Sequence, residues 1–320
     1  MCPRVPLWAR LYTRLGGNGS PGTTAAAIGH DRGVPLGSPI KAPALVALGL
    51  RADPLLPGQT TPYSLIEPLE RGDSGELIAR LDAVLGEFGH VIVVNPTWFA
   101  PAARLRVEMA ELILDRPRLA IHDTALPPLA AGVLSSLAAA VAPELPSPGA
   151  LVAALPQLER ELLWFAWLRT VSGLDEPQPR LTQHASSYLP WTRFVVSSHP
   201  EPGVQRVPRG GARPAVPQLG PGYGLVYAPW SDDEGWVDDV LARALGLDAR
   251  LLEPSPHAPV WWGTEQVVEA VVHPLDMAAL GARLTAGLEL RTCGWCDELV
   301  ASAPCPFCGF APRPQGSPAG

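Results

Sequence analysis

Short apolar runs that alternate with helix-spaced apolar residues limit how this chain can fold more than any other feature. The runs at 44–50, 91–94 and 119–121 are apolar at nearly every position, which is typical of strands buried on both faces of a sheet. Between these runs, residues 73–89 and 99–114 carry apolar side chains three or four positions apart, as amphipathic helices do. The alternation predicts an α/β fold with a mainly parallel, doubly wound sheet of about six strands and flanking helices.

Three further elements extend the alternation. Residues 127–142 are alanine-rich and predict a helix. Apolar side chains recur every three or four positions over residues 151–171, which predicts one long amphipathic helix. The short apolar run at 260–262 predicts a strand, and we expect another strand at 267–272.

The pattern divides the chain into five segments. Residues 1–41 hold many glycines and prolines and few apolar runs, so we expect a flexible tail there. Residues 42–198 and 223–290 form two α/β regions, which can share one sheet. The Pro/Gly-rich residues 199–222 between them are interpreted as a linker or long loop. Residues 291–320 hold a cysteine-rich module and a C-terminal tail.

Four of the five cysteines lie in that module, as Cys293-Gly-Trp-Cys296 and, after eight residues, Cys305-Pro-Phe-Cys308. A lone Cys-x-x-Cys pair would favour a redox dithiol, but a second pair nearby favours metal. Residues 293–309 resemble the short bacterial tetracysteine zinc ribbons, in which two such pairs flank a small hairpin. The resemblance implies that all four cysteines bind one structural Zn²⁺. Four thiolates leave no open position at the metal for catalysis.

The body of the chain carries no motif by which a family can be recognised, but its composition excludes several classes of protein. The formal net charge is −7, and residues 291–320 hold only Arg291 and Arg313 as basic side chains. Nucleic acid is therefore a poor partner, because neutralising phosphates takes several Lys or Arg side chains. No apolar run approaches the ~20 residues that span a bilayer. The start of the chain lacks the apolar segment of a secretory signal. We expect a cytoplasmic protein without a membrane partner.

Polar side chains follow two of the predicted strands. Asn95 comes directly after the run at 91–94, and His122 and Asp123 come after the run at 119–121. Parallel strands end at the same edge of a sheet, where ligands of open α/β sheets bind. His122 and Asp123 could serve there as a base and an orienting carboxylate. Asp123 is also a good residue to begin a helix, which is the alternative interpretation.

Tryptophan is abundant, and four of the ten gather within residues 230–262, in the last third of the chain. These four are Trp230, Trp236, Trp261 and Trp262. Buried, they belong to a core; exposed, they would mark a binding surface.

These features favour a non-catalytic binding or assembly component that acts through contacts with another protein. The reasons are a closed zinc site and the lack of an assignable nucleophile–base pair. The first alternative is an α/β enzyme that acts on a small molecule or nucleotide at the strand carboxyl edge, with Asn95, His122 and Asp123 in one open cavity. The second alternative is nucleic-acid contact by the ribbon. For an assembly component we expect that edge to be covered, with His122 bonded to nearby backbone.

Overall fold

The structure, a computed structural model, describes residues 42–55, 61–65, 72–115, 118–189, 191–207, 216–231 and 235–311. The tail predicted for residues 1–41 lies outside these ranges, and so do parts of the predicted linker and the end of the C-terminal tail. Residues from Ile40 onward belong to one compact unit. No helix within the described ranges is long and apolar enough to cross a bilayer.

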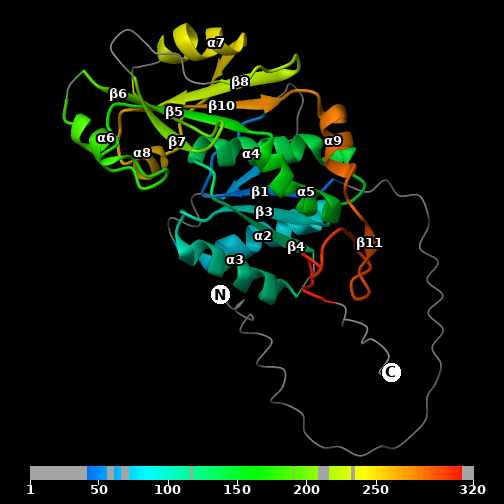
Figure 1. Cartoon of the computed structure of the whole chain (residues 1–320). Coiled ribbons are helices and arrows are strands. Elements are labelled where there is room, and N and C mark those ends of the chain that lie inside the picture. Colours follow the sequence, from blue (N-terminus) through cyan, green and yellow to red (C-terminus); the bar gives the residue numbers. More distant parts are fainter. Residues whose placement is uncertain are drawn as a thin grey trace, which may run out of the picture. The chain divides into compact units, whose positions relative to one another are not determined.

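The first sheet is parallel, with the strand order β2-β1-β3-β4 (Figure 1). Its strands are β1 (Ala44–Leu48), β2 (Tyr63–Leu65), β3 (Val91–Pro96) and β4 (Leu119–Thr124). β3 and β4 pair in parallel along their whole lengths, as expected for the two apolar runs joined by a helix. The predicted α/β fold with a parallel sheet is therefore confirmed for this half of the chain.

Helices cover both faces of this sheet. Its helices are α2 (Ser74–Phe88), α3 (Pro101–Leu114), α4 (Pro128–Val141) and α5 (Pro148–Arg160). Val46 and Val93 pack in one core with α2 and α3. Leu45 and Ile92, one residue earlier in their strands, pack in the opposite core with α4 and α5. Successive side chains of a strand point to opposite faces, so strands covered on both sides need apolar residues throughout.

The second sheet has the strand order β7-β6-β5-β10-β8-β9. Its strands are β5 (Leu163–Leu168), β6 (Arg193–Ser197), β7 (Gly203–Val207), β8 (Tyr223–Pro229), β9 (Ala249–Leu251) and β10 (Val267–Pro274). Neighbouring strands are antiparallel except for β8 and β9. The expectation of a mainly parallel arrangement is therefore wrong for this half. Every residue of β10 is buried, and a strand covered on both faces shows the same apolar run whichever way its neighbours point.

Three predicted elements need correction. The long helix expected over 151–171 ends at Arg160, and β5 follows it. Residues 162–168 are apolar at every position, which suits a doubly covered strand better than a helix. The strand expected at 260–262 lies in a short helix, which has Pro259 in its first turn and ends at Gly263 with φ 64°. The predicted linker at 199–222 contains β7, so the change of sheet comes before β5 instead.

α4 lies between the two sheets (Figure 1) and all its residues except Ala140 are buried. Val226, Ala228 and Val271 of the second sheet share its core. The other helical segments are η3 (Ala142–Glu144), α6 (Leu181–Ser186), η4 (Val237–Ala242), α7 (Arg243–Leu245), α8 (Ala258–Trp262) and α9 (Met277–Thr285). The two sheets therefore form one body with a shared helix.

Candidate functional site

Asn95 and Asp123 lie opposite each other at the carboxyl edge of the parallel sheet. Asn95 Nδ2 donates a hydrogen bond of 2.7 Å to Asp123 Oδ1. Arg104 of α3 forms an ion pair with Asp123 and donates a hydrogen bond of 2.9 Å to Glu108. The structure thus brings two of the three polar residues singled out from the sequence together, in a network that ties α3 to the sheet.

His122 points to the other face of β4. Its Nε2 lies 3.0 Å from Glu159 Oε1 on α5, so it is bonded to a side chain and not to backbone as expected for an assembly component. Burial opposes ionisation of Glu159, but hydrogen bonds from His122 and Thr124 outweigh it, so the pKa of Glu159 is lowered. Because successive residues of a strand face opposite ways, the side chains of His122 and Asp123 leave β4 on opposite faces of the sheet.

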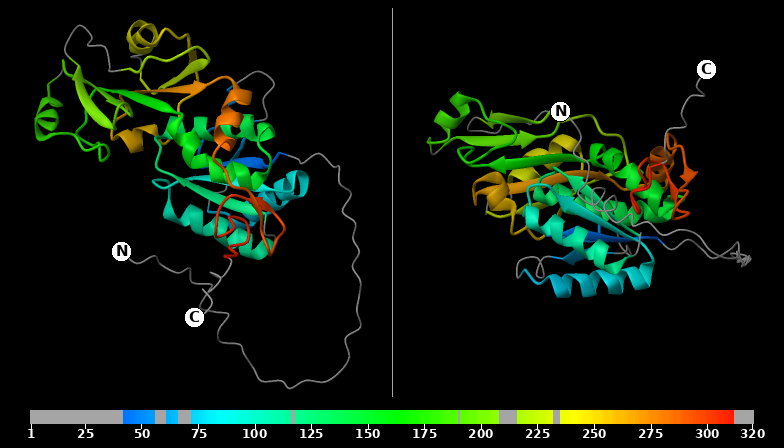
Figure 2. Two further views of the ribbon diagram at one scale, coloured as in Figure 1. Left: turned by 45° about the vertical axis from the view of Figure 1, so that its right-hand side comes forward. Right: turned by 90° about the horizontal axis from the view of Figure 1, so that it is seen from below.

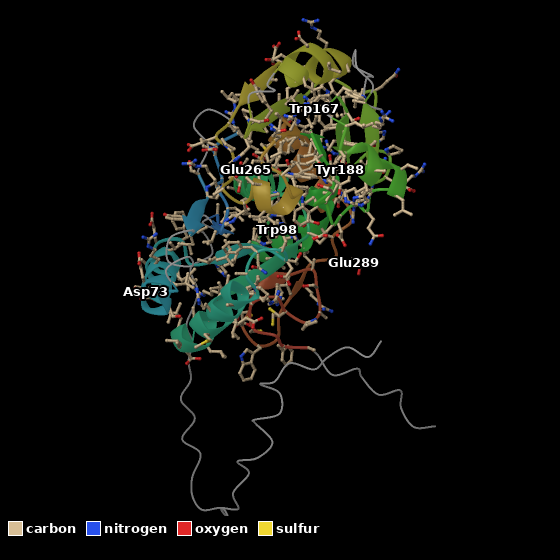
Figure 3. All side chains as sticks on the ribbon, turned by 90° about the vertical axis from the view of Figure 1, so that its left-hand side faces the viewer. Asp73, Trp98, Trp167, Tyr188, Glu265 and Glu289 are labelled. Carbon is tan, nitrogen blue, oxygen red and sulfur yellow. The ribbon has the colours of Figure 1, made fainter. Side chains whose placement is uncertain are left out.

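Aromatic side chains from both halves meet beyond this edge. Trp98, which is labelled in Figure 3, follows β3. Its ring lies 5.5 Å from that of Trp261 and 5.9 Å from that of His257. Phe99 lies 4.8 Å from His257. Trp98 also donates a hydrogen bond of 2.8 Å to the carbonyl oxygen of Leu126, ahead of α4. This cluster joins the carboxyl edge to the helix that precedes β10.

The second sheet contains a buried carboxyl group. Glu269, in the middle of β10, is 2% exposed, and its Oε1 accepts a hydrogen bond of 3.2 Å from the backbone N–H of Leu129. Burial raises the pKa of Glu269 to about 7, although the nearby side chain of Trp262 and the hydrogen bond from the backbone N–H of Leu129 act in the opposite direction. Leu129 is in the first turn of α4, where the helix dipole also favours a negative charge.

A small cavity opens beside the first turns of α4, with a volume of about 10 Å³, room for about one water molecule. It is lined by Arg51, Asp53, Leu55, Pro128, Leu129, Gly132, Val133, Ser136, Leu252, Glu253 and Ser255. Arg51 and Glu253, which both line it, form an ion pair. Arg250 donates a hydrogen bond of 2.8 Å to the carbonyl oxygen of Pro54. These contacts hold the segment after β1 against the segment after β9, so the two halves are closed on each other here.

A larger cavity, of about 140 Å³, lies near the other end of α4. It is lined by Ala42, Pro43, Ala142, Pro143, Leu145, Ser147 and Pro148. Of its described lining residues, Ser147 alone has a polar side chain. Charged side chains line the cavity at the carboxyl edge instead.

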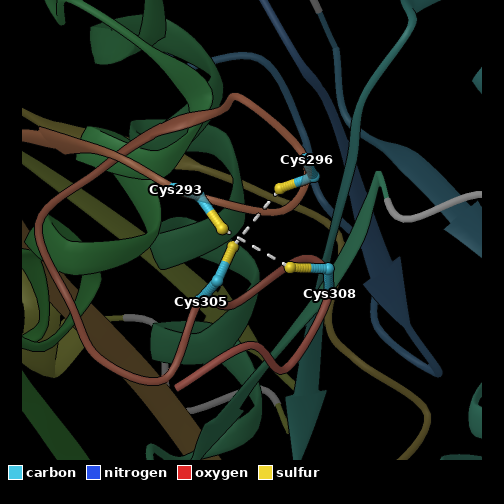
Figure 4. A group of neighbouring side chains, drawn as sticks. All are labelled: Cys293, Cys296, Cys305 and Cys308. Atoms are coloured by element: carbon cyan, nitrogen blue, oxygen red, sulfur yellow. Dashed lines mark hydrogen bonds between the residues drawn. The ribbon is translucent and has the colours of Figure 1, made fainter. Parts of the chain in front are cut away.

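The four cysteine sulfurs form a separate candidate metal centre (Figure 4). Their Sγ atoms all lie within 4.8 Å of one another, so the group could hold a metal ion. Each Cys-x-x-Cys pair closes a tight turn: Asp297 N–H donates to Cys293 O at 3.1 Å, and Gly309 N–H donates to Cys305 O at 2.9 Å. Asp297 and Gly309 both have positive φ, 59° and 69°. These turns give the two pairs the same local form.

The cysteine module packs against the amino end of the parallel sheet and α5, as both views in Figure 2 show (orange to red, beside the green helices). Its hairpin consists of β11 (Arg291–Thr292) and β12 (Leu299–Val300). Ser147 Oγ donates a hydrogen bond of 2.7 Å to Leu299 O, and His90 Nε2 lies 2.7 Å from Glu298 Oε1. A Cβ at Gly149 would clash with Leu299 O, so only glycine allows this approach. The module is therefore part of the main fold.

No protein-family model matches the sequence, and no curated protein matches it. Solved structures do match the architecture. A DegV family protein from Corynebacterium glutamicum is 13% identical with a TM-score of 0.50, and the match covers 75% of this chain and 99% of that one. A DegV family protein from Thermus thermophilus, whose structure is described as showing fatty acid binding, is 16% identical with a TM-score of 0.51, covering 72% and 99%.

The chain has the DegV fold. The body of the chain, in which the sequence offered no recognisable family, is therefore placed by its architecture. The expected assembly component, acting through contacts with another protein, is contradicted by this finding, since the structure of the Thermus protein with this fold is described as showing fatty acid binding. At 13% and 16% identity, the apolar pattern of the strands and helices is the signal that sequence reasoning could have used.

Proposed function

We propose that this chain binds a long-chain fatty acid, or a related amphipathic lipid, at the carboxyl edge between its two sheets. The observation that carries the proposal is the DegV fold, shared over 99% of a Thermus protein described as binding fatty acid. The two halves of the present chain meet where open α/β folds bind ligands, at the carboxyl ends of the parallel strands.

The chemistry of this edge suits an amphipathic ligand. The first turns of α4 offer Leu129 and Val133, while Arg51 and Ser255 are polar groups at the same cavity. Burying one methylene group contributes about 0.8 kcal/mol, so a chain of about fourteen methylenes gains ~11 kcal/mol before the costs of ordering and of opening the protein. Ligand pockets commonly measure 300–1,000 Å³. The closed cavity of about 10 Å³ must therefore widen when a fatty acid enters.

Direct binding tests this proposal. Delipidated full-length protein titrated with hexadecanoate should bind about one molecule per chain. Hexanoate is the control, since ten fewer methylenes remove ~8 kcal/mol of burial and should abolish binding at the same concentration. Folded protein that binds no saturated or unsaturated fatty acid of twelve to eighteen carbons would contradict the proposal.

We propose further that Cys293, Cys296, Cys305 and Cys308 bind one structural Zn²⁺. Four thiolates and tight turns at both pairs support zinc, and tetrahedral zinc sites of this ligand set have no open position. The role is bracing, because the module packs on α5 and on the start of β3. Elemental analysis of protein purified without chelator should find about one zinc per chain.

A further inference from the structure

The backbone of Arg51, a lining residue of the small cavity, is held by close contacts. Arg51 follows β1 after Gly49, whose φ of 65° turns the chain beneath the ring of Phe99. Its carbonyl oxygen lies against Gly132 of α4, so closely that any Cβ at Gly132 would clash with it. The main chain of Arg51 is therefore held beside α4, and its side chain lines the cavity there.

Both charged and apolar side chains line the cavity. Arg51 lines it together with Leu129 and Val133 of α4 and with Leu252. A cation beside apolar side chains suits a molecule with one carboxylate and one hydrocarbon chain. An arginine binds a carboxylate through two parallel N–H groups, which also fixes the orientation of the ligand.

A carboxylate of the chain already occupies this position. Glu253 forms an ion pair with Arg51, and its side chain is 66% exposed. Asp53 lines the same cavity, so its lining includes two carboxylates and one guanidinium group. A ligand carboxylate can enter only if Glu253 leaves Arg51. That exchange costs little, because an exposed ion pair contributes little and Glu253 can turn into water.

We propose that Arg51 binds the carboxylate of the fatty acid and that Glu253 pairs with Arg51 when no ligand is bound. This inference rests on the proposed function and names the residue that selects the headgroup. It predicts opposite effects for the two partners of one ion pair. Loss of Arg51 removes the anchor, whereas loss of the Glu253 charge removes a competitor.

The experiment compares two ligands of equal length, hexadecanoate and hexadecan-1-ol, by titration of delipidated full-length protein. Arg51→Gln should weaken hexadecanoate binding about tenfold or more, the usual effect of losing a hydrogen bond to a charged group. It should change hexadecan-1-ol binding less than about twofold, since the alcohol carries no charge. Glu253→Gln should tighten hexadecanoate binding by up to about fivefold and leave the alcohol unchanged.

The matched control is another exposed ion pair, Arg243 with Asp239 on η4 and α7. Arg243→Gln and Asp239→Asn should leave both ligands unchanged. If Arg51→Gln does not fold, Arg51→Lys and Glu253→Gln supply the comparison. The Arg51→Lys variant should bind hexadecanoate more weakly than wild type, because lysine cannot form the bidentate contact of arginine.

The outcomes separate the two proposals. A wild-type chain that binds neither ligand would overturn the proposed function and this inference with it. A wild-type chain that binds hexadecanoate, with equal affinity in Arg51→Gln (or in Arg51→Lys, where that variant replaces it), would overturn the inference alone. So would a Glu253→Gln variant that binds hexadecanoate more weakly than wild type.

Discussion

Glu269 accepts a hydrogen bond from the backbone N–H of Leu129, 140 residues away in the sequence, at 3.2 Å. The bond links the middle strand of one sheet to the helix that covers the other. It also places an ionisable group in the core, where burial raises its pKa to about 7. The stability of the chain should therefore respond to pH through this residue.

Glu269→Gln keeps an acceptor for Leu129 and removes the charge. The folded pKa of Glu269, about 7, lies above the ordinary value of 4.5, so as pH rises the unfolded chain releases this proton first. Its favourable contribution is complete below about pH 4.5 and is lost progressively up to about pH 7. Between pH 5 and 8, the free energy of unfolding, measured with urea, should fall by about 2 kcal/mol more for the wild type than for the variant. Parallel pH curves would contradict the assignment.

A control for that measurement is Glu111→Gln in α3. Burial and the neighbouring charge of Glu108 raise the pKa of Glu111 to about 7. Glu111 is partly exposed, so its contribution to the pH dependence of stability should be smaller than that of Glu269 and should be screened by salt. The two variants separate the core contribution from the surface one.

Gly149→Ala should loosen the cysteine module. The added methyl group meets the carbonyl oxygen of Leu299 and the side chain of Val300, so the hairpin must move or the chain must absorb ~1–3 kcal/mol of strain. Gly86→Ala in α2 is the matched control, because nothing lies within 4 Å of its added Cβ. That change should stabilise the protein by ~0.5–1 kcal/mol. Thermal unfolding of both variants compares the two sites, and an unaffected Gly149→Ala would show that the packing of the hairpin is not close.

Cys305→Ser should lose the metal and lower the melting temperature together. Cys305 is 4% exposed and shares a small core with Val300, Phe307 and Ala120 of β4, so loss of the metal also loosens packing on the sheet. Cys2→Ser is the control, since Cys2 belongs to neither pair. Metal content and calorimetry of both variants would check this, and a Cys305→Ser protein that keeps its zinc would refute the ligand set.

His122→Phe should destabilise the chain by ~1–3 kcal/mol at pH 7, because it leaves the half-buried carboxylate of Glu159 short of a donor. The lowered pKa of Glu159 means that this stabilisation is present above its ordinary pKa and is lost as the pH falls through the folded value. The double change His122→Phe with Glu159→Leu should recover part of the loss. Urea unfolding measures the stability of all three variants. A double variant that loses as much stability as the two single variants together, or more, would argue against this pairing.

Local signals predicted much of the first half. The helix predicted over 73–89 is present, with Asp73 as its N-cap and with Gly89 in the left-handed conformation at its end. The parallel pairing of β3 and β4 follows from two apolar runs and a helix of the right length between them. The clustering of the four cysteines follows from their spacing alone.

Other features depend on contacts that no local pattern encodes. The apolar run at 163–168 does not say whether its neighbours in the sheet are parallel or antiparallel. The stripe on α3 looked like a core face, yet Leu105 and Leu112 are exposed while Ala103 and Val107 are buried. Small residues lie inward there because α2 and the sheet come close. The pair of Arg51 with Glu253 joins residues 202 positions apart, so the candidate headgroup site could not be read from either segment.

The position of α4 determines how this chain can move. Dividing the chain between α5 and β5 would expose one face of α4, whose residues are buried against both sheets. Neither half therefore has a complete hydrophobic core by itself. The two halves should accordingly unfold in one cooperative transition rather than as separable modules. For the same reason, we expect the cavity that Arg51 and Glu253 line to widen beside the first turns of α4 while the rest of the helix stays packed between the two sheets.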